Sequence, residues 1–189
     1  MAISADPLNM IICGVGGQGN ILLSGMVGSA YIKKGGYATI GETFGAAQRG
    51  GAVFSSVRVS QKREYGPLMP EGKAHIIIGL EPLESLRMVQ KYGNPDTVCI
   101  SNTYPVVPAG VAANRDTYPE LDELKEAMAT LTKQCWFLDA TEIALELGAP
   151  IAMNIVMIGA VLGTEQLTLT PDDIKAELQA SLPPDRLDL

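Results

Sequence analysis

The chain has 189 residues and a formal net charge of −7; 47% of its residues are hydrophobic but only 5% are aromatic. This length and composition suit one domain with an aliphatic core. No cluster of Lys or Arg marks a nucleic-acid surface, and the longest apolar run, 151–163, is too short to span a bilayer. We therefore expect a soluble, cytoplasmic protein that binds neither nucleic acid nor a membrane.

Cysteine and histidine usage argues against a self-contained catalytic centre. The three cysteines, Cys13, Cys99 and Cys135, each lie in an apolar run, and no C-x-x-C pair occurs. Such cysteines are typical of small buried residues in a reducing compartment, so we expect no metal or iron–sulfur cluster on this chain. The single histidine, His75, enters a buried strand, and we interpret it as structural.

Apolar runs and helical periodicity alternate along the chain. Strands are predicted at 10–13, 37–41, 53–59, 74–79, 97–101 and 135–138. Helices are predicted from Gly17, Pro82, Pro119 and Thr170 onward and over 140–147 and 151–162.

Two of these segments carry a further expectation. The 53–59 strand alternates as a half-exposed strand does, and the 151–162 helix is apolar nearly all round, as a buried helix is.

This alternation predicts an α/β fold: a mostly parallel, Rossmann-like sheet with helices on both faces. No repeat or linker divides the chain, so we expect a single domain over 1–189, with 1–8 as an N-terminal extension.

A glycine-rich motif follows the first predicted strand. Gly14, Gly16 and Gly19 fit G-x-G-x-x-G, with Gly17 and Gln18 between them, and Glu42 ends the next strand. This context is that of an NAD or FAD fingerprint, in which glycines permit a sharp turn and helix N–H groups face the pyrophosphate. The alternative is a tight strand-to-helix turn without a ligand. The sheet uses almost the whole chain, which leaves no domain to hold a substrate against a nicotinamide.

The segment 42–51 (ETFGAAQRGG) places one arginine among glycines and small residues, just past the expected carboxyl edge of the sheet. Ligands and partners bind at that edge in doubly wound sheets. Arg49 could bind a carboxylate or phosphate through its guanidinium, or it could be an ordinary solvated arginine. Glu81, at the start of a helix, is a weaker candidate, because a helix N-terminus favours a carboxylate without any further role.

Taken together, four motifs carry a family resemblance: GVGGQG at 14–19, ETFG at 42–45, QRGG at 48–51 and PEGKA at 70–74, followed by GLEPLE at 79–84. The chain resembles the gamma-type domain of the pyruvate/2-oxoacid:ferredoxin oxidoreductases over essentially its whole length. The QRGG and GLEPLE forms look more like the beta subunit of the indolepyruvate branch.

The resemblance implies a division of labour. Thiamine diphosphate, magnesium and [4Fe-4S] clusters would be held by a partner, the thiamine-binding large (alpha) subunit. The enzyme would oxidatively decarboxylate a 2-oxoacid to an acyl-CoA, with coenzyme A as co-substrate and ferredoxin as electron acceptor. This chain would hold no cofactor and would be inactive alone. Ala46 and Ala47 stand where a bulkier residue is expected, which leaves the 2-oxoacid open.

Within that frame, the carboxyl-edge residues are expected to face the partner. Glu42 and Gln48 would fix the loop, Arg49 with Gly50 and Gly51 would contact the partner, substrate or coenzyme A, and the 14–19 turn would lie beside them. We also expect a sizeable apolar patch, because obligate interfaces resemble a core cut open. A free-standing dinucleotide-binding protein and a purely structural interaction module are the competing hypotheses.

Overall fold

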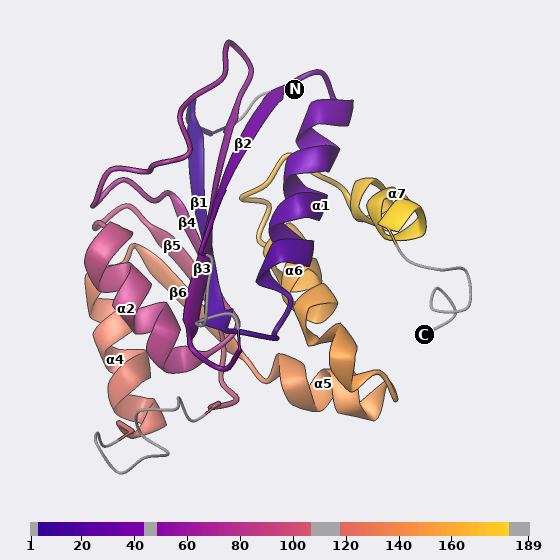
Figure 1. Ribbon diagram of the computed structural model, residues 1–189. Coiled ribbons are helices and arrows are strands. Elements are labelled where there is room, and N and C mark those ends of the chain that lie inside the picture. The colour runs from indigo at the N-terminus through magenta and orange to yellow at the C-terminus, as the bar shows by residue number, and fades with distance from the viewer. Residues whose placement is uncertain (1–3, 44–48, 107–117, 182–189) are drawn as a thin grey trace.

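The computed structural model describes residues 4–43, 49–106 and 118–181, and within them six strands form one sheet in the order β2-β3-β1-β4-β5-β6 (Figure 1). The strands are β1 (Leu8–Val15), β2 (Tyr37–Glu42), β3 (Ala52–Ser60), β4 (Ile76–Gly79), β5 (Val98–Asn102) and β6 (Gln134–Leu138). The strands β1, β4, β5 and β6 are parallel, as predicted, and only β3 opposes them.

The strand β3 differs in part from its prediction. It pairs antiparallel with both β1 and β2, so it lies inside the sheet, and Ser55 and Ser56 on it are buried. The predicted alternation holds, with Val53, Ser55, Val57 and Val59 buried and Phe54 and Arg58 partly exposed, but Ser56 on the more exposed side is also buried. The connection from β2 to β3 is too short for a crossover, which a parallel pair requires, so the two strands form a hairpin. The hairpin then inserts β3 between β1 and β2.

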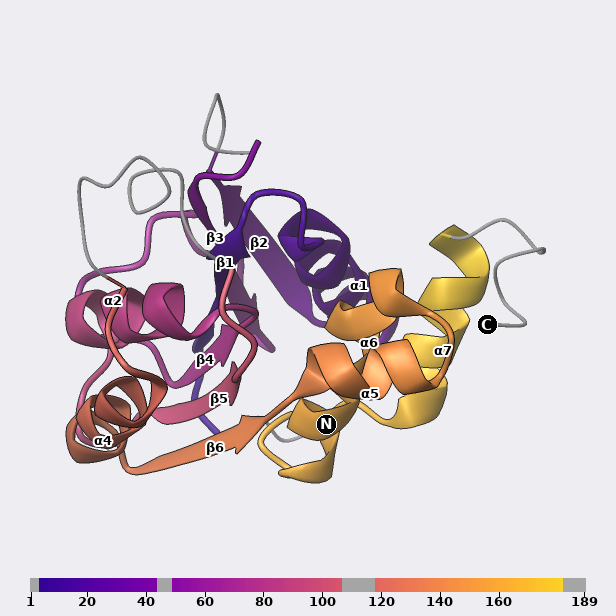
Figure 2. The same ribbon diagram turned by 90° about the horizontal axis from the view of Figure 1, so that it is seen from below.

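Helices cover both faces of the sheet, as expected (Figure 2). One face is covered by α1 (Asn20–Lys33) and α6 (Met153–Gly163), with α7 (Pro171–Ser181) packed on α1 and α5 (Ala140–Glu146) packed on α6. The other face is covered by α2 (Pro82–Tyr92) and α4 (Leu121–Leu131). The core on both faces is aliphatic, with Ile11, Ile12 and Ile77 fully buried in the central strands. No helix of the described chain is long and apolar enough to cross a membrane.

Two boundaries differ from those predicted. The N-terminal extension ends before residue 8, because Leu8 begins β1 and is buried. The 151–162 segment is not one buried helix: Ile151 lies in the short 3₁₀ helix η2 (Pro150–Ala152) and is 77% exposed, while α6 buries only one side. Pro150 explains the short helix, since it fixes the backbone at a helix start.

The strands β1, β2, β4, β5 and β6 all end at one edge of the sheet, the lower end in Figure 1, which we call the carboxyl edge. Because β3 runs the other way, it begins at this edge. The turn after β1 and the start of β3 therefore meet there.

Candidate functional site

The glycine turn joins β1 to α1 at the carboxyl edge. Gly17 and Gly19 have φ angles of 106° and 90°, a backbone region that L side chains rarely adopt. Gly19 is the N-cap of α1, and no side chain caps this helix. The glycines at these two positions are thus required by the turn itself.

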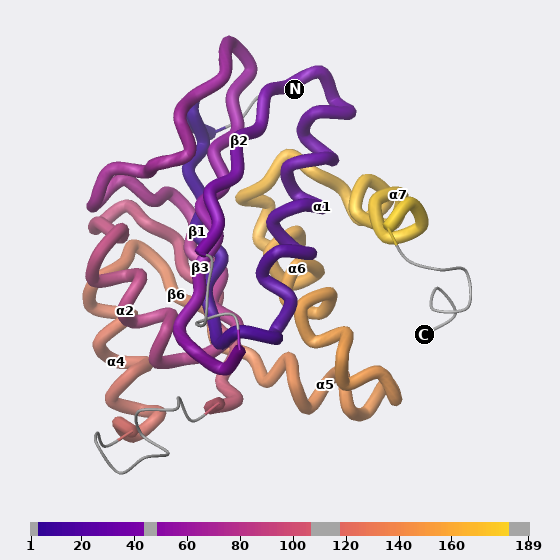
Figure 3. The backbone as a smooth tube through the Cα atoms, viewed as in Figure 1, coloured from indigo at the N-terminus to yellow at the C-terminus, as the bar shows by residue number. Residues whose placement is uncertain are grey.

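The two sequence motifs meet through their backbones. The Gly16 N–H donates to the Gly51 carbonyl at 2.9 Å, and the Gly50 N–H donates to the Gly16 carbonyl at 3.2 Å. The backbone tube in Figure 3 follows both segments to the same edge of the sheet. Arg49 is exposed beside this pair, while Gln48, Ala46 and Ala47 lie outside the described residues. The expected contact of the 14–19 turn with residues 50–51 is confirmed.

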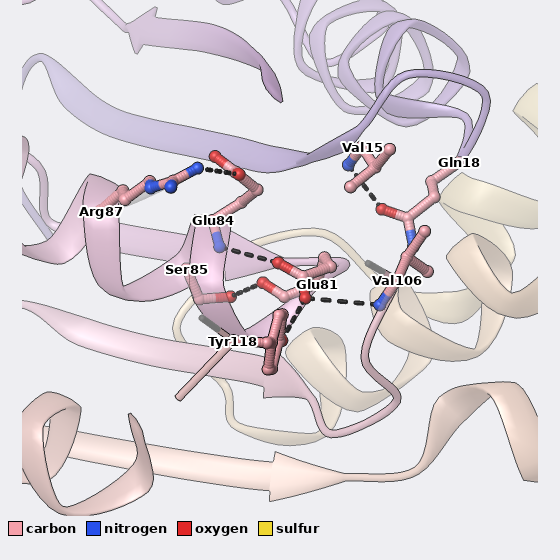
Figure 4. A network of polar contacts seen from close by, with 8 residues as sticks. All are labelled: Val15, Gln18, Glu81, Glu84, Ser85, Arg87, Val106 and Tyr118. Carbon is pink, nitrogen blue, oxygen red and sulfur yellow. Dashed lines mark hydrogen bonds and ion pairs between the residues drawn. The ribbon is translucent and has the colours of Figure 1, made fainter. Parts of the chain in front are cut away.

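The Gln18 side chain joins the end of β1 to Leu80, the residue after β4, and Figure 4 shows its amide pointing at Val15. Its Oε1 accepts the Val15 N–H at 2.7 Å, and its Nε2 donates to the Leu80 carbonyl at 3.0 Å. A Cβ on Gly14 would lie 2.5 Å from Gln18 Oε1. Gly14 is therefore needed for this close approach, and Gln18 joins two neighbouring strands.

A second amide continues this bridge toward β5. Asn102 Nδ2 donates to the same Leu80 carbonyl at 3.1 Å and to Thr141 Oγ1 at 3.0 Å, and Asn102 Oδ1 accepts the Ala140 N–H at 3.0 Å. Asn102 is fully buried. The two amides thus connect β1, β4, β5 and the start of α5.

Glu42 is bound by two serine hydroxyls. Ser24 of α1 donates to Oε1 at 2.6 Å, and Ser55 of β3 donates to Oε2 at 2.5 Å. Both oxygens of the carboxylate are therefore engaged within the chain. Glu42 thus joins the end of β2 to α1 and β3 through partners that the sequence did not reveal, and its expected role in fixing the 42–51 loop stays a prediction.

A cavity of about 290 Å³ remains between these motifs. It is lined by glycines of the turn, the first residues of α1 and the ends of β2 and β3: Gly16, Gly17, Gly19, Asn20, Ile21, Glu42, Thr43, Val53, Phe54 and Ser55.

The arrangement does not fit a dinucleotide. In that fold the ligand lies in the crevice at the switch point, between the ends of the first strand and its neighbour. Here Gln18 fills the crevice, and residues 50–51 bind the Gly16 backbone. At the start of α1, Asn154 Nδ2 would lie 2.2 Å from a Cβ on Gly19. Glu42 is also separated from β1 by an inserted strand. The chain's own groups thus bond to the glycine turn and to the ends of β1 and β4, and what remains free beside the glycines is the cavity of about 290 Å³.

A group of buried polar residues lies around the first turn of α2 (Figure 4). Glu81 is fully buried and caps the helix, its Oε2 accepting the Glu84 N–H at 2.8 Å. Burial raises the pKa of Glu84, against the influence of Arg87, and the nearby Glu81 raises it further. The predicted position of Glu81 at the start of the helix is confirmed, whereas its other partners could not be foreseen from the sequence.

The surroundings of His75 and of the three cysteines are those of structural residues, held by the fold. His75 Nδ1 accepts the Asn9 N–H at 3.0 Å, and burial together with Lys73 lowers the pKa of the imidazole. Burial raises the pKa of the Cys13 thiol. Cys99 and Cys135, far apart in sequence, are register partners on β5 and β6, and all three cysteines are free. No cluster of metal-ligating side chains occurs among the described residues.

Sequence reasoning missed the polar residues that organise the edge: Ser24, Ser55, Asn102, Tyr118 and Asn154. Two of them did carry a signal. Asn102 ends a buried apolar strand, and Asn154 interrupts an apolar run; a polar residue in such a place must find a partner inside the protein.

Comparison with known proteins points to the same family as the sequence motifs. The family model of pyruvate ferredoxin/flavodoxin oxidoreductase matches residues 9–188. Indolepyruvate oxidoreductase subunit IorB of Archaeoglobus fulgidus is 36% identical over 182 residues, which cover 96% of this chain and 89% of that protein. The protein of the same name from Pyrococcus horikoshii is 35% identical with the same coverage.

More distant proteins share the fold. The gamma subunit of a keto/oxoacid ferredoxin oxidoreductase from Geobacter sulfurreducens has a TM-score of 0.64 at 18% identity, covering 95% of this chain and 89% of that one. The 2-oxoglutarate:ferredoxin oxidoreductase of Magnetococcus marinus has a TM-score of 0.72 at 19% identity; the match covers 98% of this chain but 29% of that one. With a family model that spans nearly its whole length and relatives above 30% identity, this chain belongs to the pyruvate ferredoxin/flavodoxin oxidoreductase family.

Proposed function

We propose that this chain is the small subunit of a 2-oxoacid:ferredoxin oxidoreductase whose substrate is indolepyruvate or a related aryl pyruvate. The observation that carries the proposal is the 36% identity to an indolepyruvate oxidoreductase subunit along 96% of the chain. A further relative, 28% identical over 78% of this chain, is named as the gamma subunit of an NADH-dependent phenylglyoxylate dehydrogenase, and its substrate is also an aryl 2-oxoacid.

In this proposal the chemistry is shared between subunits. The larger companion subunit holds thiamine diphosphate, magnesium and [4Fe-4S] clusters, which supply decarboxylation and electron transfer when bound. The 2-oxoacid loses carbon dioxide, its acyl group passes to coenzyme A, and two electrons pass to ferredoxin. The present chain contributes the carboxyl edge as a rigid surface, and its residues hold no cofactor of their own.

The surface of the chain supports assembly with a companion. Leu147, the C-cap of α5, and Ile151 of η2 are 67% and 77% exposed, and Ile143 and Leu145 of α5 are also exposed. Exposed aliphatic side chains of this size are typical of surfaces that a partner covers. They lie next to the carboxyl edge, because α5 directly follows the end of β6.

The proposal is tested by co-expressing this chain with the companion subunit, purifying by a tag on this chain, and assaying indolepyruvate-dependent dye reduction with coenzyme A. Co-purification with activity that requires this chain is the expected result. A complex that prefers pyruvate or an aliphatic 2-oxoacid would leave the subunit role intact and reject the aryl substrate. If no companion co-purifies, the subunit role is wrong.

Arg49 offers a test of the carboxyl edge itself. Arg49→Ala should leave the thermal unfolding of the isolated chain unchanged, because the side chain is exposed, and should reduce assembly or turnover at least severalfold. Arg63→Ala is the matched control: this arginine is exposed just past the end of β3, at the opposite edge of the sheet. Normal assembly and normal turnover of the Arg49 variant would remove Arg49 from the site.

A further inference from the structure

One buried carboxylate joins three separate parts of the chain at the carboxyl edge. Glu81 is fully buried at the N-cap of α2. Its Oε2 accepts the Glu84 N–H at 2.8 Å, within its own helix. Its Oε1 accepts the Val106 N–H at 3.4 Å and the Tyr118 hydroxyl (Figure 4).

The two remote donors come from two separate segments of the chain. Val106 follows β5 and Tyr118 precedes α4, so one carboxylate oxygen holds two residues that are distant in sequence. Figure 4 shows the two residues approaching Glu81 from different segments.

The three groups that contact the Glu81 carboxylate are all hydrogen-bond donors. The three donors are two backbone N–H groups and a hydroxyl, and hydrogen bonds to a charged acceptor are the stronger kind. A helix N-terminus further favours negative charge at this place. Burial and the hydrogen bond with Glu81 raise the pKa of the Tyr118 hydroxyl, so Tyr118 remains a donor.

Capping the first turn of α2 does not by itself require a glutamate. An aspartate at the N-cap is among the best caps available, and it would satisfy the first turn of α2 equally well. Glutamate carries one more methylene, which lets its second oxygen reach Val106 and Tyr118. The choice of glutamate is therefore explained by the remote contacts rather than by the helix.

We propose that Glu81 is a positioning residue that holds Val106, after β5, and Tyr118, before α4, in place at the carboxyl edge, and that these two residues form part of the surface that binds the companion subunit. The second part of this statement rests on the proposed function; the first part concerns the isolated chain only.

Three variants separate capping from positioning. Glu81→Asp keeps the charge and the cap but withdraws the second oxygen from Val106. Glu81→Gln keeps the size, but its single acceptor oxygen can serve either the cap or the remote donors. Tyr118→Phe removes one remote donor and leaves Glu81 intact. Glu84→Gln is the control for the loss of a buried carboxylate on α2, because the Glu84 side chain pairs with Arg87 at 2.5 Å and only its backbone N–H bonds to Glu81.

The first readout is amide hydrogen exchange at Val106, measured by NMR on the isolated full chain. Exchange should accelerate about tenfold in Glu81→Asp, which withdraws the acceptor of the Val106 N–H, as expected from losing one hydrogen bond. It should accelerate by a smaller factor in Tyr118→Phe, because the Val106 N–H keeps its acceptor while Glu81 loses a second contact. Exchange at Glu84 should stay unchanged in both. Val106 exchange that equals the unmodified protein's in all three variants would overturn the positioning role.

The second readout is the dissociation constant for the companion subunit, with turnover at saturating companion measured alongside. Glu81→Asp should weaken binding about tenfold at unchanged kcat, and Glu84→Gln should leave both unchanged. Faster exchange with normal binding would reject the link to assembly while leaving the positioning role standing. If the unmodified chain binds no companion, the proposed function fails, and the exchange result still decides the first part.

Discussion

At the scale of single residues, His75 shows how burial determines the behaviour of a titratable side chain. Its Nδ1 accepts a backbone N–H of β1, and protonation would break that bond. Burial and Lys73 lower its pKa below the ordinary value of about 6.5. As pH falls below about 6.5, the unfolded chain takes up a proton before the folded one does, so stability is lost in that window.

We therefore expect the imidazole to titrate below about 6.5 by NMR, an assignment that is unambiguous because the chain has one histidine. The free energy of unfolding should decline between about pH 6.5 and the folded pKa, by at most ~1.4 kcal/mol per pH unit. His75→Asn should remove that part of the decline. A folded pKa at or above the ordinary value would show that the imidazole accepts no stable hydrogen bond.

Gly14 and Gln18 form a second residue-scale unit. Gly14→Ala places a methyl group 2.5 Å from Gln18 Oε1 and 3.0 Å from Leu80 Cβ. The amide must then give up its bonds to Val15 and Leu80, at a cost of about 1–3 kcal/mol.

Gln18→Ala loses the same bonds without any clash, so the double variant should be less destabilised than the sum of the single ones, by at least ~0.5 kcal/mol. Chemical denaturation of the four proteins measures this coupling. Additive effects would mean that the close approach of Gly14 and Gln18 does not contribute to stability.

At the scale of elements, α7 is held to α1 by ion pairs as well as by the buried Ile174. Lys34 Nζ lies 2.6 Å from Asp173 Oδ2, and that oxygen also accepts the Thr170 N–H at 2.7 Å. Partial burial acts to raise the pKa of Asp173, but the bonds from Lys34 and Thr170 outweigh it and lower the pKa. The stabilisation is thus present above the ordinary pKa of about 3.9 and is lost as pH falls through the folded value.

Asp173→Asn should cost roughly 1 kcal/mol at pH 7, from a weakened cap and a lost exposed ion pair. For a chain of this size that is a fall of about 2–4 °C in Tm. Asp172→Asn is the control, since Asp172 lies in the same turn and is exposed. The difference between the variants should shrink in high salt. Equal Tm values at low salt would contradict the role of the Lys34 contact.

The elements themselves were largely predictable, because each strand and helix except η2 follows the local periodicity of the sequence. Two features were not. The position of β3 depends on which strand its hairpin joins, a long-range choice that alternation along 53–59 cannot encode. The exposure of Ile151 depends on whether a partner covers it, and a hydrophobic sequence reads the same in a core and in an interface.

At the scale of the whole molecule, the candidate site was predictable as a set of motifs and unpredictable as a geometry. The motifs placed the 14–19 turn, Glu42 and residues 50–51 at one edge, and the structure brings them together there. The side chains that hold them, such as Ser24, Ser55 and Asn102, come from α1, β3 and β5, which are far from these motifs or from one another in sequence. Their hydroxyls and amides look ordinary in sequence, and only the fold reveals their partners.

The glycine fingerprint is the sharpest case, because its sequence context fits a dinucleotide and its structure does not. The purified chain should therefore show no saturable binding of NAD⁺ or FAD in isothermal titration at ligand concentrations up to about 100 µM, a threshold near −5.5 kcal/mol. The physical reason is that the chain's own groups bond to the places a pyrophosphate would contact: the Gln18 amide joins the ends of β1 and β4, and residues 50–51 are hydrogen-bonded to the glycine turn. Gln18→Ala empties only the crevice and leaves the Gly50–Gly51 contact and Asn154 in place, so it should not create binding either. Stoichiometric binding by the unmodified chain would require these contacts to open, and it would return the free-standing dinucleotide-binding protein as the better hypothesis.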